Sequence, residues 1–549
     1  MKRNRWTRFL AGPLVVYVVM SWSGGEPVFA EAPVPVSVFV ELNASDLASM
    51  RAAVDQIESY GGVCTHIFPF RGCIGGLPAG VDKALSAQPE IAGVYRGAID
   101  PADLAQRDSA LDLAVTVWSR LLVDQPAEAS PAGSVDPPPP PHDALAAPGR
   151  PVTMLAPAAR AVSTAPDYYQ TSEFLAGSVT VGIVMPESNG AIDTNQETWS
   201  TARQDNVIAE IAAAMSWWTA HEPAAGLSFV YDVARSVPTS YEPINHSQTE
   251  EALWISDAMT ALGYPGTSRW TQTLDYDNAL RDAYGTDWAF TVFVVDDLVD
   301  GDNMFAPTPG GRTYFAYAYL GGPFMVMTYG NDGYGPANMD AVMAHEMGHI
   351  FLAQDGYSGS ASCTAISGYL DIQNSNSLTP LQNSCGMDMP CIMRGQIAPY
   401  AAGVISTSAR GQLGWRDSDG DGVLDPLDTA AGLTVWRSAF RLAGDTMTWF
   451  LAGVAQDYAY PSPSRVGTTI NTVQSVECQV DGGLWNALSA ADGAWDGPQE
   501  SFAIQTAPLS TATHRVNVRV TNSVGNSTSQ VVVVFAPDTN AVYLPQVER

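Results

Sequence analysis

Apolar residues recur along the chain with spacings that change from one region to the next, and these changes divide it into domains. Residues 33–100 begin with strand-like alternation at Val36–Glu41 and end with another strand-like run at Ile91–Tyr95. Between them we expect a helix over Ser45–Tyr60, two strands and a short second helix. The order β-α-β-β-α-β predicts a small α+β domain of the split βαβ type.

Residues 167–416 mix strand-like and helical spacing, which predicts a second, larger α+β domain. A strand, a long amphipathic helix and further strands lead to an apolar helical rhythm that ends in two histidines. The predicted elements are, in order, a strand at Ser178–Met185, a helix at Thr194–His221, a buried strand at Thr291–Val295, an edge strand at Phe324–Tyr329 and a helix containing Met339–Ala344.

Residues 431–537 alternate short β-rich runs with turns, as in Arg515–Val520 and Gln530–Phe535. Short strands at this spacing predict an all-β sandwich of the immunoglobulin-like or fibronectin-like kind. We expect the sandwich either to bind a substrate, a surface or another protein, or only to stabilise the rest of the chain. Residues 538–549 form a tail.

Residues 1–30 have the features of a secretory signal peptide. A basic start at Met1–Arg5 precedes an apolar stretch at Phe9–Met20, and Ala30 supplies a small residue at a cleavage boundary. The apolar stretch is interrupted by Gly12–Pro13 and is short for a membrane span, and no later run is long enough to cross a bilayer. We therefore expect a secreted, extracellular protein without a membrane span in its mature form.

Residues 101–166 are predicted to form a linker between the two α+β domains. From Gln125 to Pro166 the chain is rich in proline and alanine, and it includes the run Pro137–Pro141. This composition favours an extended, cleavable segment.

Net charge argues against some classes of partner, and the cysteine content favours disulfides. The formal charge of −31, from 26 basic and 57 acidic residues, argues against nucleic acids and anionic membranes as partners. Six cysteines in an exported chain favour disulfides, and Cys64 with Cys73 can close one small loop. The other four, Cys363, Cys385, Cys391 and Cys478, allow three pairings, and a bond from Cys363 to Cys385 or Cys391 would brace the loop that carries Met393.

The strongest candidate for a catalytic metal site is the run His345-Glu346-Met347-Gly348-His349. Two histidines four residues apart lie on one face of a helix, so both imidazoles can reach one zinc ion. The glutamate between them can reach a water at the same ion. The competing interpretation is a structural helix whose histidines only pack, but the apolar rhythm before the motif favours a buried active-site helix.

A catalytic zinc usually has three protein ligands, so a third is needed. Between Ile350 and Val476 the chain has no glutamate and no histidine, which argues against a downstream glutamate ligand. Asp355, six residues after His349, is the best candidate, because the chain can leave the helix and return to the metal. The alternative is a solvated aspartate just past the helix end.

The extended run from His345 to Asp355 resembles that of metzincin-like zinc peptidases, in the snapalysin-like or immune-inhibitor-A-like form that ends in aspartate. The resemblance covers roughly residues 167–416 and implies a metzincin-like catalytic domain. It assigns Zn²⁺ to His345, His349 and Asp355, makes Glu346 the catalytic residue, and implies an edge strand that aligns a peptide substrate.

Two further positions bear on this resemblance. Met393, in the loop Cys391–Gly395, matches the methionine turn beneath the zinc, although a methionine there also fills a core gap. Leu352 stands where the family has a glycine, and leucine is disfavoured at positive φ. Either the turn is made differently, for instance through Gly356, or Asp355 is not the ligand.

The domain at residues 33–100 loosely resembles the inhibitory propeptides of subtilisin-like proteases, which are ferredoxin-like α+β domains. The resemblance implies a prodomain that assists folding and blocks the cleft until it is removed. The alternative is an ordinary small α+β domain. A thiol of Cys73 acting on the zinc is less favoured than its disulfide with Cys64.

Residues 417–428 match the oxygen-rich calcium loop of EF-hand and dockerin-type repeats. Acidic residues at loop positions 1, 3, 5, 9 and 12, with glycine at position 6, predict a Ca²⁺ site, because so many close carboxylates repel one another without a cation. The alternative is a solvated acidic turn. The predicted ligands are Asp417, Asp419, Asp421, Val423 through its carbonyl, Asp425 and Asp428.

Together these features predict a secreted zinc-dependent endopeptidase, made as a zymogen, that hydrolyses peptide bonds in protein or peptide substrates. The competing hypothesis is a non-catalytic surface or adhesion protein in which zinc and calcium only stabilise a scaffold. Leu352 favours the scaffold hypothesis, whereas the intact Glu346 favours the enzyme.

Overall fold

The computed structural model describes residues 36–100, 104, 108–123, 145–146, 165–356, 365–376, 390–395 and 397–534. The chain is a multidomain α+β protein that forms two compact units. The described residues of 36–150, 168–368 and 372–415 form the first unit, and those of 165–167, 369–371 and 416–534 form the second. The expected signal peptide and tail lie outside the described residues.

The N-terminal part of the first unit has the predicted order of strands and helices. Its core contains the apolar residues of all four strands and of the first helix. A capping box between Asp46 and Ser49 starts that helix, because each side chain bonds to the other's backbone N–H. The elements are β1 (Val36–Leu42), α1 (Leu47–Ser59), β2 (Val63–Phe68), β3 (Gly72–Leu77), α2 (Asp82–Leu85) and β4 (Ile91–Tyr95).

These four strands continue into the larger sheet instead of standing apart from it. The whole sheet has ten strands in the order β4-β1-β3-β2-β7-β6-β8-β10-β9-β5. The joint is a short parallel pairing of β2 with β7, in which His66 lies opposite Phe229 and Ile67 opposite Val230. The remaining strands are β5 (Leu145–Ala146), β6 (Ser178–Ser188), β7 (Ser228–Thr239), β8 (Trp288–Val295), β9 (Ala316–Leu320) and β10 (Phe324–Thr328).

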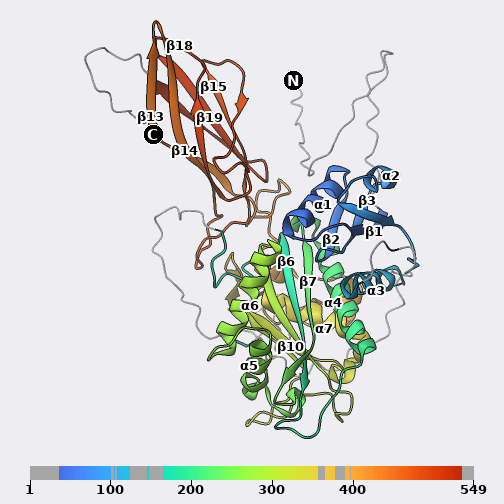
Figure 1. Cartoon of the computed structure of the whole chain (residues 1–549). Helices are drawn as coiled ribbons and strands as arrows, with labels where there is room; N and C mark the ends of the chain where they lie inside the picture. Colours follow the sequence, from blue (N-terminus) through green and yellow to red (C-terminus); the bar gives the residue numbers. More distant parts are fainter. Residues whose placement is uncertain are drawn as a thin grey trace, which may run out of the picture. The chain divides into compact units, whose positions relative to one another are not determined.

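Helices cover both faces of this sheet (Figure 1). α5 and α6 pack on each other and on β6, β7 and β8, whereas α4 packs on α3 and α7. α4 begins at Thr201 and not at Thr194 as predicted, because Ser200 caps it by accepting the N–H of Arg203. The helices are α3 (Ser109–Val123), α4 (Thr201–His221), α5 (Ala252–Ala261), α6 (Arg269–Tyr284), α7 (Met339–Ile350), α8 (Ile397–Ala402) and α9 (Thr407–Gln412), with 3-10 turns at Pro223–Ala225, Pro243–Asn245, Gln248–Glu250, Asp332–Tyr334 and Pro336–Asn338.

The prediction of an edge strand at Phe324–Tyr329 is wrong. β10 lies inside the sheet, parallel to β8 on one side and antiparallel to β9 on the other. All five of its residues are buried, as for an interior strand. The next strand toward this end of the sheet is β9, and the two-residue strand β5 lies outermost.

The predicted linker also differs from the structure, because residues 109–123 form the helix α3. Leu111, Ala114, Val117 and Trp118 are buried, at the spacing of one helical face, and α3 packs on α4. The proline-rich part of the predicted linker lies outside the described residues except for β5.

The second unit is all-β, as predicted. Two antiparallel sheets share one core that contains Trp449, Val476 and Phe502. One sheet has β13 (Ala430–Ala443), β14 (Thr446–Tyr458), β17 (Gln499–Gln505) and β18 (Leu509–Ser510), and the other has β15 (Val473–Val480), β16 (Asn486–Ala487), β19 (His514–Asn522) and β20 (Ser527–Val534).

The cysteine predictions are confirmed in one case and wrong in another. Cys64 and Cys73 form a disulfide between β2 and β3. Cys391 and Cys478 are buried free thiols, so the pairings that use either of them are wrong. The thiol of Cys391 instead accepts the backbone N–H of Ser406 at 3.2 Å. The pairing of Cys363 with Cys385 lies outside the described residues.

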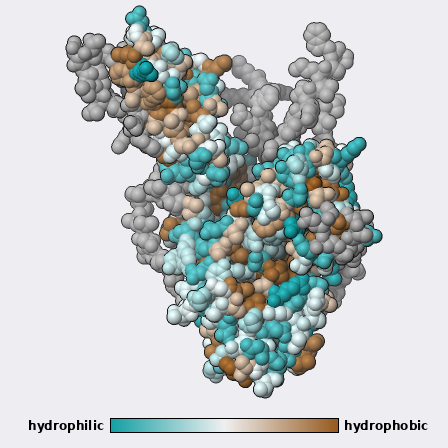
Figure 2. Space-filling view, viewed as in Figure 1, coloured by the Kyte–Doolittle hydropathy of each residue, from teal (hydrophilic) through white to brown (hydrophobic). Residues whose placement is uncertain are grey.

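The described surface mixes polar and apolar residues on the face shown in Figure 2. The most exposed large apolar side chains are Leu484 and Val299, at 86% and 77%. Within the described ranges, no helix combines the length and the apolar character that a membrane crossing requires.

Candidate metal centre

α7 places the two motif histidines side by side. Every residue from Val342 to Ile350 is buried, so the motif is enclosed by the rest of the unit. The imidazoles of His345 and His349 lie edge to face with ring centroids 4.9 Å apart. A four-residue helical spacing produces this arrangement, as the sequence predicted.

Asp355 completes the group. Its Oδ1 lies 3.3 Å from Nε2 of His345 and 3.2 Å from Nε2 of His349. One ligand atom from each of the three residues lies within 4.8 Å of the other two. Asp355 is 2% exposed, so the alternative of a solvated aspartate past the helix end is wrong.

The turn from α7 to Asp355 is made at Leu352, so the alternative of a turn through Gly356 is also wrong. Leu352 has a φ of 74°, in the left-handed region. Its N–H donates to His349 O at 2.9 Å, and the N–H of Ala353 donates to Gly348 O at 2.8 Å. This pair of bonds is a Schellman motif with leucine at the position that glycine usually occupies.

The backbone around the histidines fixes which ring nitrogen faces the group. His345 Nδ1 lies 2.7 Å from Ile392 O, and His349 Nδ1 lies 2.8 Å from Ala353 O. A carbonyl accepts only from a protonated nitrogen, so Nδ1 carries the proton of each neutral ring. Both Nε2 lone pairs then point toward Asp355, as metal ligation requires.

Glu346 lies in the same enclosed site. It is 1% exposed, and neither of its carboxylate oxygens has a hydrogen-bond partner among the described residues. Burial raises its pKa to about 8, although His345 acts in the opposite direction. For Asp355 burial also opposes ionisation, but the positive charges of His349 and His345, in their protonated forms, hold its pKa below the usual value.

Met393 lies against α7 where the sequence placed a methionine turn. A Cβ on Gly348 would approach the sulfur of Met393 to 2.4 Å, so the two residues are in close contact. Met393 is 1% exposed, and its carbonyl accepts the N–H of Gly356 at 2.6 Å. The sequence carries no signal for this role of Gly348, because only the fold shows that its missing side chain makes room for Met393.

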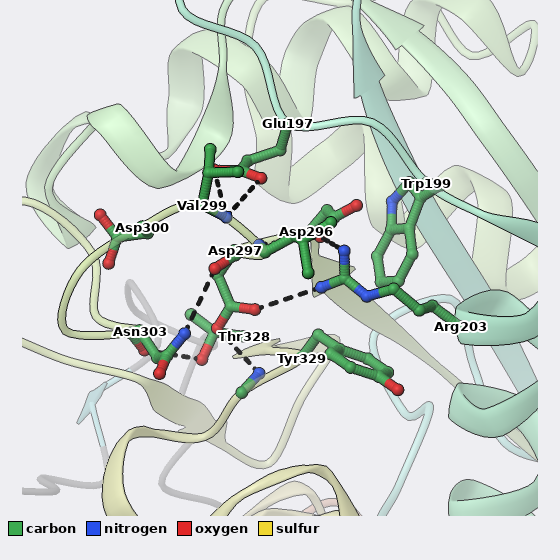
Figure 3. Close-up of polar contacts among 12 residues, drawn as sticks. Glu197, Trp199, Arg203, Asp296, Asp297, Val299, Asp300, Asn303, Thr328 and Tyr329 are labelled. Carbon is green, nitrogen blue, oxygen red and sulfur yellow. Dashed lines mark hydrogen bonds and ion pairs between the residues drawn. The ribbon is translucent and has the colours of Figure 1, made fainter.

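A buried ion-pair network fixes the strands that lead to α7 (Figure 3). Arg203 pairs with Asp296 and Asp297 at the end of β8, and its guanidinium lies over the ring of Tyr329. Asp297 also accepts the N–H of Gly330 at 2.8 Å, which ties the end of β8 to that of β10. Burial raises the pKa of Asp297 to about 6. The sequence showed no pattern for this network, because its members come from separate segments.

The acidic loop of the second unit gathers three of its predicted ligands. Carboxylate oxygens of Asp417, Asp419 and Asp421 lie within 4.8 Å of one another, and all three residues are exposed. Asp417 accepts the N–H groups of Gly420 and Gly422, at 2.7 and 3.0 Å, which closes the loop around its carboxylate.

The later loop positions have other partners in the structure. Asp425 accepts the N–H and the hydroxyl of Ser418, at 2.7 and 2.6 Å. Asp428 accepts from Asn526 at 2.8 Å. The structure therefore does not bring the carboxylates of Asp425 and Asp428 into the group formed by Asp417, Asp419 and Asp421.

Comparison with known proteins does not assign this chain to a family. No family model matches the chain, and no curated protein sequence matches it. Structures of OgpA from Akkermansia muciniphila, one of them with an O-glycopeptide substrate, are 11% identical, with a TM-score of 0.22 over 68% of this chain and 97% of that chain. The sulfane dehydrogenase SoxCD from Paracoccus pantotrophus is 12% identical, with a TM-score of 0.15. The match covers 20% of this chain and 30% of that chain. Such TM-scores carry no argument about fold or function.

Proposed function

We propose that this chain is a secreted zinc-dependent endopeptidase, made as a zymogen, with a metzincin-like catalytic domain. The observation that carries the proposal is the convergence of His345, His349 and Asp355 around a buried Glu346. Two imidazoles and a carboxylate are a usual ligand set for catalytic zinc, and they leave room for water or substrate. The orientation of both histidines by backbone carbonyls supports this assignment.

The residues supply the parts that peptide hydrolysis needs. A zinc ion bound there would polarise the scissile carbonyl and favour deprotonation of a water. Neither carboxylate oxygen of Glu346 has a partner among the described residues, so the ionised side chain can accept a proton from the attacking water and donate it to the leaving amine nitrogen. Met393 and Gly348 keep the helix against the loop beneath it.

The remaining regions fit accessory roles in such an enzyme. The N-terminal strand order β4-β1-β3-β2 supports a ferredoxin-like domain, for which we propose the prodomain role. We assign an immunoglobulin-like fold to the second unit and Ca²⁺ to Asp417, Asp419 and Asp421. The export signal in residues 1–30 supports secretion.

Casein hydrolysis by the full chain, with bound zinc quantified, tests the proposal. The N-terminal strands should be kept during folding, because β2 pairs with β7. Limited trypsin treatment can then cut the connecting segment after Arg160. Glu346→Ala should keep zinc and lose hydrolysis, whereas Asp355→Ala should lose stoichiometric zinc and keep only weak binding through His345 and His349. Folded protein with neither hydrolysis nor stoichiometric zinc would instead support a non-catalytic surface or adhesion protein.

A further inference from the structure

The turn that delivers Asp355 is strained. Leu352 has a φ of 74°, and a non-glycine residue in this conformation costs on the order of 1–2 kcal/mol. Its side chain is only 4% exposed, and burying a leucine contributes about 1.5–3 kcal/mol. Burial of the side chain therefore offsets the strain, but it does not by itself fix the direction in which the next three residues run.

Three polar side chains bind the backbone of this turn. Ser367 Oγ donates to Leu352 O at 2.6 Å, and Asn374 Nδ2 donates to Asp355 O at 2.8 Å. Gln412 Oε1 accepts the N–H of Gln354 at 2.9 Å. Each bond is made to a different residue of the turn, so its two ends and the residue before Asp355 are all held.

These three side chains are buried and are themselves fixed. Ser367, Asn374 and Gln412 are 8%, 2% and 1% exposed. Ser367 ends β11 (Ile366–Ser367), which pairs with β12 (Ile372–Gln373), and Asn374 follows β12 directly. Gln412 ends α9, and its Nε2 donates to Ile372 O at 3.2 Å, so the hairpin and α9 are joined.

We infer that Ser367, Asn374 and Gln412 are positioning residues for the metal centre, and that they replace the glycine expected at position 352. Together they hold Asp355 where its Oδ1 faces both histidines, at 3.2 and 3.3 Å. They act on the backbone of the turn and through Asp355, in the way that residues behind metal ligands tune affinity. This inference rests on the proposed zinc site, but not on hydrolysis by it.

The test is zinc affinity of the full chain, measured by chelator competition, beside the stability of the metal-free protein. Ser367→Ala, Asn374→Ala and Gln412→Met should each weaken zinc binding by about tenfold. Thr239→Val is the matched control, because Thr239 is 1% exposed and its hydroxyl donates to Tyr241 O at 2.7 Å in another part of the unit. It should lower the stability of the metal-free protein and leave zinc affinity unchanged.

A double variant separates positioning from a general loss of structure. In an Asp355→Ala background, Gln412→Met should weaken zinc binding no further, because the ligand that Gln412 positions is gone. The inference would be overturned if the three single variants bound zinc as tightly as the wild type. It would also be overturned if Gln412→Met lowered zinc affinity in the Asp355→Ala background. Tight zinc binding by a wild type that hydrolyses nothing would refute the proposed function and leave the inference standing.

Discussion

The carboxylate of Asp355 lies 3.2 Å from Nε2 of His349, although the residue that turns the chain between them is a leucine with a φ of 74°. Leu352→Ala and Leu352→Gly both remove the buried side chain, so comparing them isolates the backbone conformation. Glycine is favoured at positive φ, and we expect Leu352→Gly to be more stable than Leu352→Ala by about 1 kcal/mol. Urea unfolding of the metal-free proteins measures this. An alanine variant at least as stable as the glycine variant would contradict the left-handed turn.

Gly348→Ala should destabilise the protein, although alanine normally favours a helix over glycine. The new Cβ would lie 2.4 Å from the sulfur of Met393, which is itself buried. Overpacking of this kind costs about 1–3 kcal/mol. The double variant with Met393→Ala should recover at least about 1 kcal/mol of the summed losses in a thermodynamic cycle. Additive losses would show that the two residues are not in contact.

His66 should make the stability of the first unit fall in mild acid. Burial lowers its pKa from 6.5 to about 4, and its ring nitrogens lie 2.7 Å from Tyr231 Oη and 2.9 Å from Ser216 Oγ. The unfolded chain therefore takes up a proton before the folded one as pH falls. Stability should drop between about pH 6.5 and pH 4, by at most about 3 kcal/mol. The free energy of unfolding of His66→Gln should fall less across this range than that of the wild type. An equal fall in the two proteins would contradict the assignment.

Glu242 should make the stability of the first unit fall as pH rises, opposite to the effect of His66. Burial, followed by repulsion from Glu197, Glu187 and Asp296, raises its pKa to about 8, although the N–H of Glu197 donates to it. The folded state keeps the proton that the unfolded chain loses above about pH 4.5. Its stabilising contribution is therefore lost as pH rises toward 8. Glu242→Gln should be more stable than the wild type by about 1–2 kcal/mol at pH 8.5 and no more stable at pH 4. Thermal unfolding at the two pH values decides this.

Calcium should stabilise the second unit through Asp417, Asp419 and Asp421. After removal of all metals by EDTA and dialysis, Ca²⁺ at about a hundred times its dissociation constant should add about 2.7 kcal/mol. Zn²⁺ alone should leave the unfolding of this unit unchanged. The variant Asp417→Asn/Asp421→Asn is the control, and it should not respond to Ca²⁺. Equal responses of variant and wild type in calorimetry would place the calcium elsewhere.

Local spacing predicted the part of the site that local geometry determines. His345 and His349 share a helix face because they are four residues apart, and Asp355 followed from the ligand types available nearby. The left-handed Leu352 was not predictable in this way. Its conformation depends on Ser367 and Gln412, which lie 15 to 60 residues later and contact the turn only after folding.

The fold was predictable to a similar extent. The N-terminal order of strands and helices followed from periodicity, but an apolar run such as Phe324–Thr328 does not distinguish an interior strand from an edge strand. The pairing of β2 with β7 has no sequence signal, since it depends on a register of only two residue pairs. The composition of residues 101–166 favours a linker, whereas the spacing of Leu111, Ala114 and Trp118 is that of one face of the helix α3.

The contacts around Asp355 also set an order of assembly during synthesis. His345 and His349 leave the ribosome together, but the carbonyl that orients His345 belongs to Ile392, and the amide that holds Gln354 belongs to Gln412. A nascent chain that ends before residue 392 therefore has both histidines and Asp355 without the carbonyl that orients His345, and one that ends before residue 412 still lacks the side chain that holds Gln354. We therefore expect firm metal binding at this site only after most of the first unit has been translated.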